Sequence, residues 1–136
     1  ITCSGSGNNY DLCVNAAGVI GSSQMQGAIV LNCDQLFLRG AIMTANDLTI
    51  QPVSIDTSIG LAGGSGTLNL PAAALGCLVN GFQSITFGRV DGLGAVEAGS
   101  YDVSCLCEAL TLQGGHVTVA QEICDTARQL TIHENE

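Results

Sequence analysis

The residue types in this chain with the greatest capacity for chemistry are cysteine and histidine. The seven cysteines are Cys3, Cys13, Cys33, Cys77, Cys105, Cys107 and Cys124, and the two histidines are His116 and His133. The five of these that lie nearest the C-terminus could be imagined as a zinc site, since zinc prefers thiolate and imidazole ligands. Structural zinc sites usually draw on cysteine pairs spaced as CxxC, however, and the chain has no such pair. We therefore expect no metal site.

Disulfide bonds are the more expected use of these cysteines. An acidic, cysteine-rich chain without lysine is typical of an oxidising, extracellular setting. Cys3 and Cys13 could close a local loop near the N-terminus, and Cys105 and Cys107, two positions apart on a strand, would face the same side. The odd number leaves at least one cysteine either unpaired or joined to another chain. The second option would lock subunits into a polymer.

The other reactive residues argue against an enzyme. A serine or cysteine nucleophile needs a nearby histidine and an orienting acid, yet the chain has only two histidines and no G-x-S-x-G turn. No lysine is present to follow a glycine run, which excludes a phosphate-binding loop. The acids considered for cleaving a polysaccharide are Asp47, Asp56, Asp91 and Asp102. Three scattered arginines would give an anionic polysaccharide no positive clamp. We expect neither catalysis nor a cofactor.

The charge of the chain also limits its partners. Its acidic residues outnumber its arginines so far that the net charge is -9. Such a surface repels the phosphate backbone of nucleic acids and anionic lipid head groups. No window of the sequence reaches the roughly 18 apolar residues that a membrane-spanning helix needs. We expect no binding to nucleic acid and no membrane insertion.

Seven apolar-x-apolar triplets indicate the elements that must position these residues. They are Leu36-Phe37-Leu38, Leu48-Thr49-Ile50, Leu68-Asn69-Leu70, Ile85-Thr86-Phe87, Leu110-Thr111-Leu112, Val117-Thr118-Val119 and Leu130-Thr131-Ile132. Each is a minimal strand with two residues facing one way and the middle residue facing the other. Strands this short cannot bury their inward residues alone, so they must stack on neighbours. The pattern predicts an all-β solenoid whose layers are filled by aliphatic side chains.

The organisation along the chain follows from the spacing of these triplets. Spacings scattered around twenty residues predict about five or six coils, with successive coils beginning near Leu36, Leu48, Leu68, Ile85, Leu110 and Leu130. A partial repeat aligns 34–40 with 108–114, and 46–51 with 128–133. Residues 1–9 are predicted to be a flexible tail, and 10–136 a single solenoid domain. Pro71 and the alanines after it predict one short helical turn near 71–80. Because the chain starts at Ile1, we expect a processed product or an excised segment.

The stretch from Leu48 to Gly94 resembles a module of giant secreted bacterial proteins of the filamentous-haemagglutinin type. The most specific part runs from Gly81 to Gly94, in the form GF-x-SI-T-x-GR-x-DG-x-G. The resemblance implies a right-handed parallel β-helix, secretion to the cell surface and an adhesive or scaffolding role. This chain departs from the pattern because it has seven cysteines and is short. Both departures favour a self-assembling subunit over a segment of a long spike.

The same run supplies the residues we expect to build a turn and a bridge, which are Gly88, Arg89, Asp91, Gly92 and Gly94. The three glycines permit positive φ at successive corners, and an Asp-Gly pair is a strong turn signal. Arg89, close to Asp91, could join adjacent coils or organise the turn. A contact to a ligand is the alternative role for Arg89.

The threonines at the centres of five triplets could stack into a column, as in ice-binding solenoids. We expect them to be ordinary exposed strand residues instead, because threonine suits that position.

The function expected from these observations is structural and extracellular. The chain would be a self-assembling subunit of a fibre or sheath, or an adhesive surface module, with other copies of itself as its main partner. A tail carrying Cys3 could add a strand to a neighbouring subunit. The alternative is a monomeric adhesin or glycan-binding module excised from a larger protein, with a host or matrix glycan or protein as partner. A β-helix enzyme acting on polysaccharide is less favoured.

Overall fold

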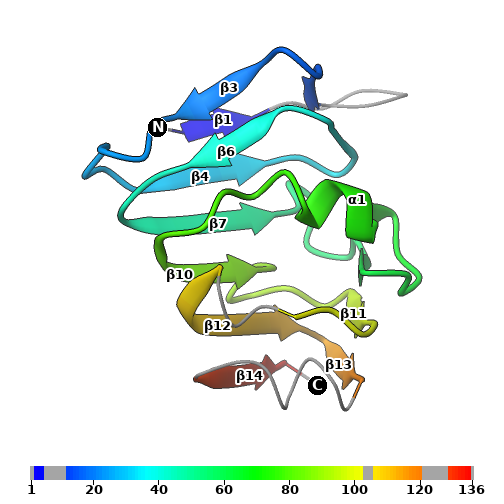
Figure 1. Cartoon of the computed structure of the whole chain (residues 1–136). Helices are drawn as coiled ribbons and strands as arrows, with labels where there is room; N and C mark the ends of the chain where they lie inside the picture. The colour runs from blue at the N-terminus through cyan, green and yellow to red at the C-terminus, as the bar shows by residue number, and fades with distance from the viewer. Residues whose placement is uncertain (1, 5–11, 103–105, 121–128, 136) are drawn as a thin grey trace.

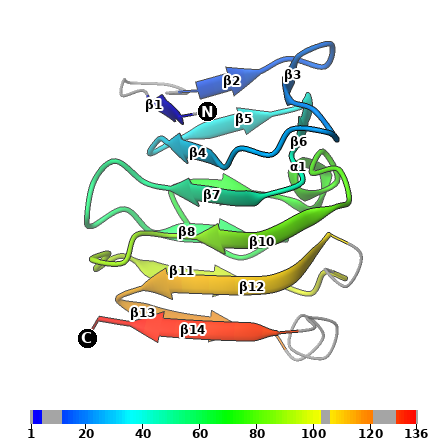
Figure 2. The same ribbon diagram turned by 90° about the vertical axis from the view of Figure 1, so that its left-hand side faces the viewer.

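The computed structural model of the protein describes residues 2–4, 12–102, 106–120 and 129–135. In this part of the chain short strands stack one above another from the N-terminus to the C-terminus (Figures 1 and 2). The molecule is a parallel β-solenoid of about five turns, as the triplet pattern predicted. No described helix is long and apolar enough to cross a membrane.

The strands line the walls of the solenoid as parallel sheets. The six-stranded sheet contains, in spatial order, β1 (Thr2–Ser4), β4 (Ile29–Asn32), β7 (Asp47–Gln51), β10 (Phe82–Phe87), β12 (Cys107–Gly114) and β14 (Leu130–Glu134). The four-stranded sheet contains β13 (His116–Val119), β11 (Ala95–Ala98), β8 (Ile59–Leu61) and β9 (Leu68–Leu70). Two pairs complete the walls near the N-terminus, β2 (Leu12–Val14) with β5 (Leu36–Leu38), and β3 (Val19–Gly21) with β6 (Ala41–Met43). Each of the seven predicted triplets lies within one of these strands.

The core consists of aliphatic columns that run along the solenoid axis. One column of the six-stranded sheet is Leu31, Ile50, Phe87, Leu112 and Ile132, and its neighbour is Ile29, Leu48, Ile85, Leu110 and Leu130. Both follow from the strand alternation, because every second residue points inward. The inward residues of β4, β7, β10 and β12 are at most 7% exposed. A stack of thin layers therefore closes a core with few aromatic side chains.

The register corrects the predicted coil boundaries. Leu48, Ile85, Leu110 and Leu130 do begin successive layers of one sheet, whereas Leu36 and Leu68 lie on other walls. The coil from Leu48 to Ile85 is consequently 37 residues long, against 20 for the coil from Leu110 to Leu130. An apolar-x-apolar triplet fits any wall of a solenoid, so the triplets alone do not say which wall each occupies.

The predicted repeat is correct in one half only. Residues 46–51 and 129–133 both contribute to the six-stranded sheet, as β7 and β14. Residues 34–40 and 108–114 do not correspond, because β5 pairs with β2 while β12 belongs to the six-stranded sheet. The resemblance between these two blocks reflects the same strand pattern on two different walls.

Outside the core, four threonines form a column in register on the six-stranded sheet. They are Thr49, Thr86, Thr111 and Thr131. Thr118 lies in β13 on another wall. Val30 of β4 continues the column in register with Thr49. Threonine and valine suit this position because their branched side chains pack on a pleated surface.

The one described helix is shorter than the predicted turn. Helix α1 covers Ala72–Leu75, and Pro71, with φ -64° and ψ 168°, is the extended residue immediately before it. It stands at the side of the stack rather than over an end (Figure 1). Ala74 and Leu75 are its buried residues, so the helix is held by packing against the wall.

The N-terminal residues correct the predicted tail in part. Residues 2–4, predicted to be flexible, form strand β1 and pair with Val30, Leu31 and Asn32 of β4. Residues 5–9 lie outside the described part of the chain. The six-stranded sheet therefore begins almost at the N-terminus.

Candidate functional site

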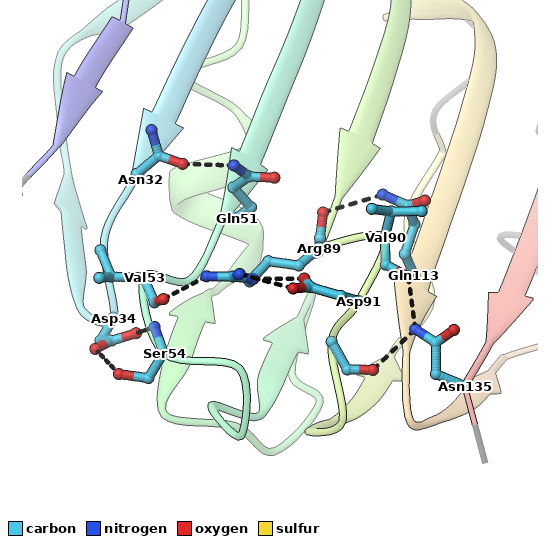
Figure 3. Close-up of polar contacts among 12 residues, drawn as sticks. Asn32, Asp34, Gln51, Val53, Ser54, Arg89, Val90, Asp91, Gln113 and Asn135 are labelled. Atoms are coloured by element: carbon cyan, nitrogen blue, oxygen red, sulfur yellow. Dashed lines mark hydrogen bonds and ion pairs between the residues drawn. The ribbon is translucent and has the colours of Figure 1, made fainter.

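Polar side chains gather along the corner where the six-stranded sheet ends and the chain turns toward the next wall (Figure 3). The Gln51 side-chain amide donates a hydrogen bond to the side-chain oxygen of Asn32, its neighbour in the coil above. Two coils further on, Gln113 Nε2 donates to the carbonyl oxygen of Gly88 at 3.1 Å. These amides connect coils that are stacked in the sheet. Their contribution is to hold the corners in register.

Arg89 is fully engaged at this corner. Its Nε donates to Asp91 Oδ1 at 2.8 Å and its Nη2 to Asp91 Oδ2 at 2.9 Å, while Nη1 donates to the carbonyl oxygen of Val53 in the preceding coil. The residue thus braces its own turn and bridges two coils. The hydrogen bond from Arg89 lowers the pKa of Asp91 below its ordinary value. Solvent reaches both side chains, so the ion pair adds little stability.

The glycines of the corner serve two different purposes. Gly88 has φ +103°, and a Cβ there would overlap the carbonyl oxygen of Gln113 in the next coil. Gly92 and Gly94, also predicted to have positive φ, do not. Gly94 is required for another reason, because a Cβ would overlap the carbonyl oxygen of Thr57. Close approach of the coils, rather than left-handed backbone, explains the second position.

Asp34 is a corner residue that sequence reasoning missed. Its Oδ1 accepts hydrogen bonds from Ser54 N at 2.9 Å and Thr57 Oγ1 at 3.0 Å, and its Oδ2 accepts one from Ser54 Oγ at 2.7 Å. Partial burial raises the pKa of Asp34, but the hydrogen bonds from Ser54 and Thr57 together outweigh it and the pKa is lowered. The only signal in the sequence is an aspartate just after a strand, and its partners lie 20 and 23 residues away.

We expect Asp34→Asn to lower the free energy of unfolding by about 1 kcal/mol at pH 7. The hydrogen bonds that the charged carboxylate accepts are stronger than those that a neutral amide oxygen accepts. Because the folded-state pKa is depressed, the carboxylate stabilises the protein fully above the unfolded value near 3.8 and loses its effect as the pH falls through the folded value. Urea unfolding of both proteins between pH 7 and pH 2 measures this. The difference in free energy of unfolding between the two proteins should become smaller below about pH 4. A difference that is constant over the whole pH range would contradict the stabilising role of the Asp34 carboxylate.

The last coil is fastened to the same corner by Asn135. Its side-chain amide donates to the carbonyl oxygens of Val90 at 2.7 Å and Gly92 at 3.0 Å (Figure 3). Val90 and Gly92 belong to the turn that Arg89 and Asp91 brace. The corner therefore runs from the coil of Asp34 to the end of the described chain, and each contact in it joins backbone or side chains of the protein itself.

The described cysteines do not pair with one another. Cys33 and Cys107 are buried, Cys77 is half-buried and Cys13 is exposed, and no disulfide joins any two of these four. The side chain of Cys3 and all of Cys105 and Cys124 lie outside the described residues, as does the predicted bond from Cys3 to Cys13. Burial raises the pKa of the Cys107 thiol, which keeps that thiol protonated and weakly nucleophilic.

Several of the residues considered for metal binding or catalysis have structural partners, whereas Asp56 is exposed on the loop after β7. His116 lies 3.6 Å from a carboxylate oxygen of Glu134, and His133 lies 3.0 Å from the side-chain oxygen of Asn135. Asp47 accepts a hydrogen bond from Ser84 Oγ at 2.8 Å. Within the described ranges, no three side chains of the metal-binding types come together. Cys105 and Cys124 of the considered zinc set fall outside these ranges.

The C-terminal end of the six-stranded sheet is open. Ile132 occupies the inward position below Leu112, yet it is 46% exposed whereas Leu112 is fully buried. Backbone groups of alternate residues point to opposite sides of a strand, so Leu130, Ile132 and Glu134 direct theirs away from β12. Among the described residues, no strand pairs with the outer edge of β14 and the side chain of Ile132 is left partly exposed.

Comparisons with models of protein families, with curated proteins and with solved structures give no match. The resemblance to filamentous-haemagglutinin modules therefore stays a prediction.

Proposed function

We propose that the protein is an extracellular structural module that assembles end to end into a fibre or sheath. The observation that carries the proposal is the inward-facing Ile132, which lies 46% exposed at the end of a column whose other described members are buried. Covering it with a further layer would continue the core, which is how each internal coil is stabilised. The acidic, lysine-free composition and the resemblance to secreted modules support a location outside the cell.

The two edge strands of the six-stranded sheet are oriented so that they could pair with each other in two neighbouring copies. β1 forms one edge and β14 the other, and all strands of the sheet are parallel. A second copy moved along the axis would therefore place its β1 on β14 in the same orientation as the pairs inside one chain. In the described part of the chain no helix covers either end. Such a head-to-tail contact does not close on itself, so it gives a filament instead of a dimer.

We expect the wild-type protein to form filaments whose amount rises with concentration, seen by negative-stain electron microscopy and light scattering. Ile132→Asp should abolish them, because a charge buried at the contact without a partner is strongly unfavourable. Ile55→Asp is the matched control, since Ile55 is 37% exposed on the loop after β7, a strand in the interior of the sheet, and the change in side chain is the same. It should leave the filaments intact.

Three outcomes of this experiment discriminate between the candidates. Isolated particles at every concentration would reject the fibre and favour the alternative, a monomeric adhesive module from a larger protein. Equal loss of filaments in both variants would show that the contact is not at the end of the sheet. Loss of wild-type filaments in reductant alone would mean that an intermolecular disulfide, rather than strand pairing, holds the subunits.

A further inference from the structure

A cleft of about 650 Å³ lies on the outside of the solenoid between β5, β9 and α1. Its origin is the 37-residue coil. Within that coil the chain folds back so that Leu68 of β9 pairs with Ile59 of β8, and α1 then stands out from the wall. β9 and β5 belong to different sheets, so the wall is interrupted between them. The cleft extends from the first coil, which contributes Ala16, to α1, and it lies away from the C-terminal end that carries Ile132.

The side chains that enter the cleft come from the outward positions of the two strands. Leu36 and Leu38 of β5 are buried in the core, so Gln35, Phe37 and Arg39 alternate with them on the outer side. Thr67 and Asn69 line the opposite wall, and Ala73 of α1 lines the third side. Amide and hydroxyl groups therefore face one another across a concave space.

Arg39 gives this cleft a positive charge, whereas the protein as a whole is negatively charged. Its guanidinium carbon lies 4.9 Å above the centre of the Phe37 ring, which fixes the planar group over the cleft. Arg39 is exposed and forms no ion pair within the described residues, whereas the charge of Arg89 is matched by Asp91. None of the described residues that line the cleft is acidic, although the chain carries a net charge of -9. The cleft is thus a positive spot on an acidic surface.

We infer that the cleft binds a carboxylated sugar unit of an acidic polysaccharide. A guanidinium pairs with a carboxylate through two parallel hydrogen bonds, and Arg39 is the one positively charged residue among the described residues that line the cleft. Gln35 and Thr67 supply an amide and a hydroxyl group of the kind that bind sugar hydroxyls, and Asn69, whose amide nitrogen donates to the carbonyl oxygen of Gly64, adds its side-chain oxygen as an acceptor. The volume is in the range of small-molecule sites and is sufficient for one or two rings. This inference does not rest on end-to-end assembly.

An acidic peptide is the competing partner, and the lining favours the sugar. Peptides are usually anchored by large apolar or aromatic side chains in fitted apolar pockets. Of the apolar lining residues, Ala16, Pro71 and Ala73 are small, and the face of Phe37 is covered by Arg39. Leu36 and Leu38 also line the cleft, but they are buried in the core and offer little surface to an anchoring side chain. Hydrogen-bonding groups on facing walls suit a ring that bears several hydroxyls.

Titration calorimetry with trigalacturonic acid, and with its fully methyl-esterified form as the uncharged probe, tests the inference. The wild-type protein should bind the acid, more weakly as salt is raised, and should bind the ester at least tenfold less tightly. Arg39→Gln should weaken binding of the acid about tenfold or more, and Arg39→Lys should recover part of the loss. Gln83→Glu changes the net charge by the same amount at an exposed position of β10 and should bind as wild type does.

Several results would overturn the inference. They are absence of binding to the acid, equal binding of acid and ester, or Arg39→Gln binding as tightly as wild type while its melting temperature is unchanged. Tighter binding of a hexa-aspartate peptide through Arg39 would replace the sugar by a peptide. Repeating the titration on Ile132→Asp separates the two proposals, because the cleft should bind equally well whether or not filaments form.

Discussion

Replacing Gly88 by alanine is expected to lower the free energy of unfolding by about 2–4 kcal/mol, one of the two largest effects of any single substitution considered for this protein. Two penalties act together at this residue. Its φ of +103° is unfavourable for any residue with a Cβ, and that Cβ would overlap the Gln113 carbonyl oxygen of the next coil. The coils would have to separate at the corner, which would also disturb the hydrogen bond from Gln113 to Gly88.

Gly81→Ala is the control that separates the two penalties. Gly81 also has positive φ, at +118°, but a Cβ there would meet nothing within 4 Å. We expect this variant to lose only about 1 kcal/mol, the strain of the backbone alone. The measurement is the midpoint and slope of urea unfolding for both variants. Equal losses would show that contact between coils at Gly88 contributes nothing.

The fold was largely predictable because its local rule is simple. Each apolar-x-apolar triplet became a strand, since alternation places two residues inward whatever wall the strand joins. The assignment of strands to walls was not predictable in the same way. It depends on where loops lengthen a coil, and the return of Leu68 onto Ile59 is produced by loop geometry that the triplets do not encode.

The corner was predictable only where its contacts are local. The run from Gly88 to Gly94 was recognisable as a turn, and Arg89 meets Asp91 two residues away. Asp34 and Asn135 could not be predicted, because their partners are 20 to 45 residues distant in sequence and adjacent only after coiling. The cleft beside Arg39 has the same origin, since it exists only when β5, β9 and α1 are brought together.

A second large effect is expected for Ile50→Ala, which should lower the free energy of unfolding by about 3–4 kcal/mol. Ile50 is fully buried at the centre of its column, with Leu31 above and Phe87 below. Removing its outer carbons leaves a cavity that tightly stacked layers cannot refill. Ile132→Ala makes the same chemical change in the same column, at a residue 46% exposed. In the isolated subunit we expect Ile132→Ala to lower the free energy of unfolding by about 1 kcal/mol or less.

The dependence of these two values on protein concentration connects stability to assembly. A neighbouring subunit that covers Ile132 binds only the folded state, so contact at the end of the sheet stabilises folding more as the concentration rises. The destabilisation by Ile132→Ala should therefore grow with concentration, while that of Ile50→Ala stays constant because its surroundings lie within one chain. Thermal unfolding at increasing concentrations of the three proteins measures both. If the loss of stability caused by Ile132→Ala is the same at every protein concentration, no subunit covers this end and the fibre proposal fails.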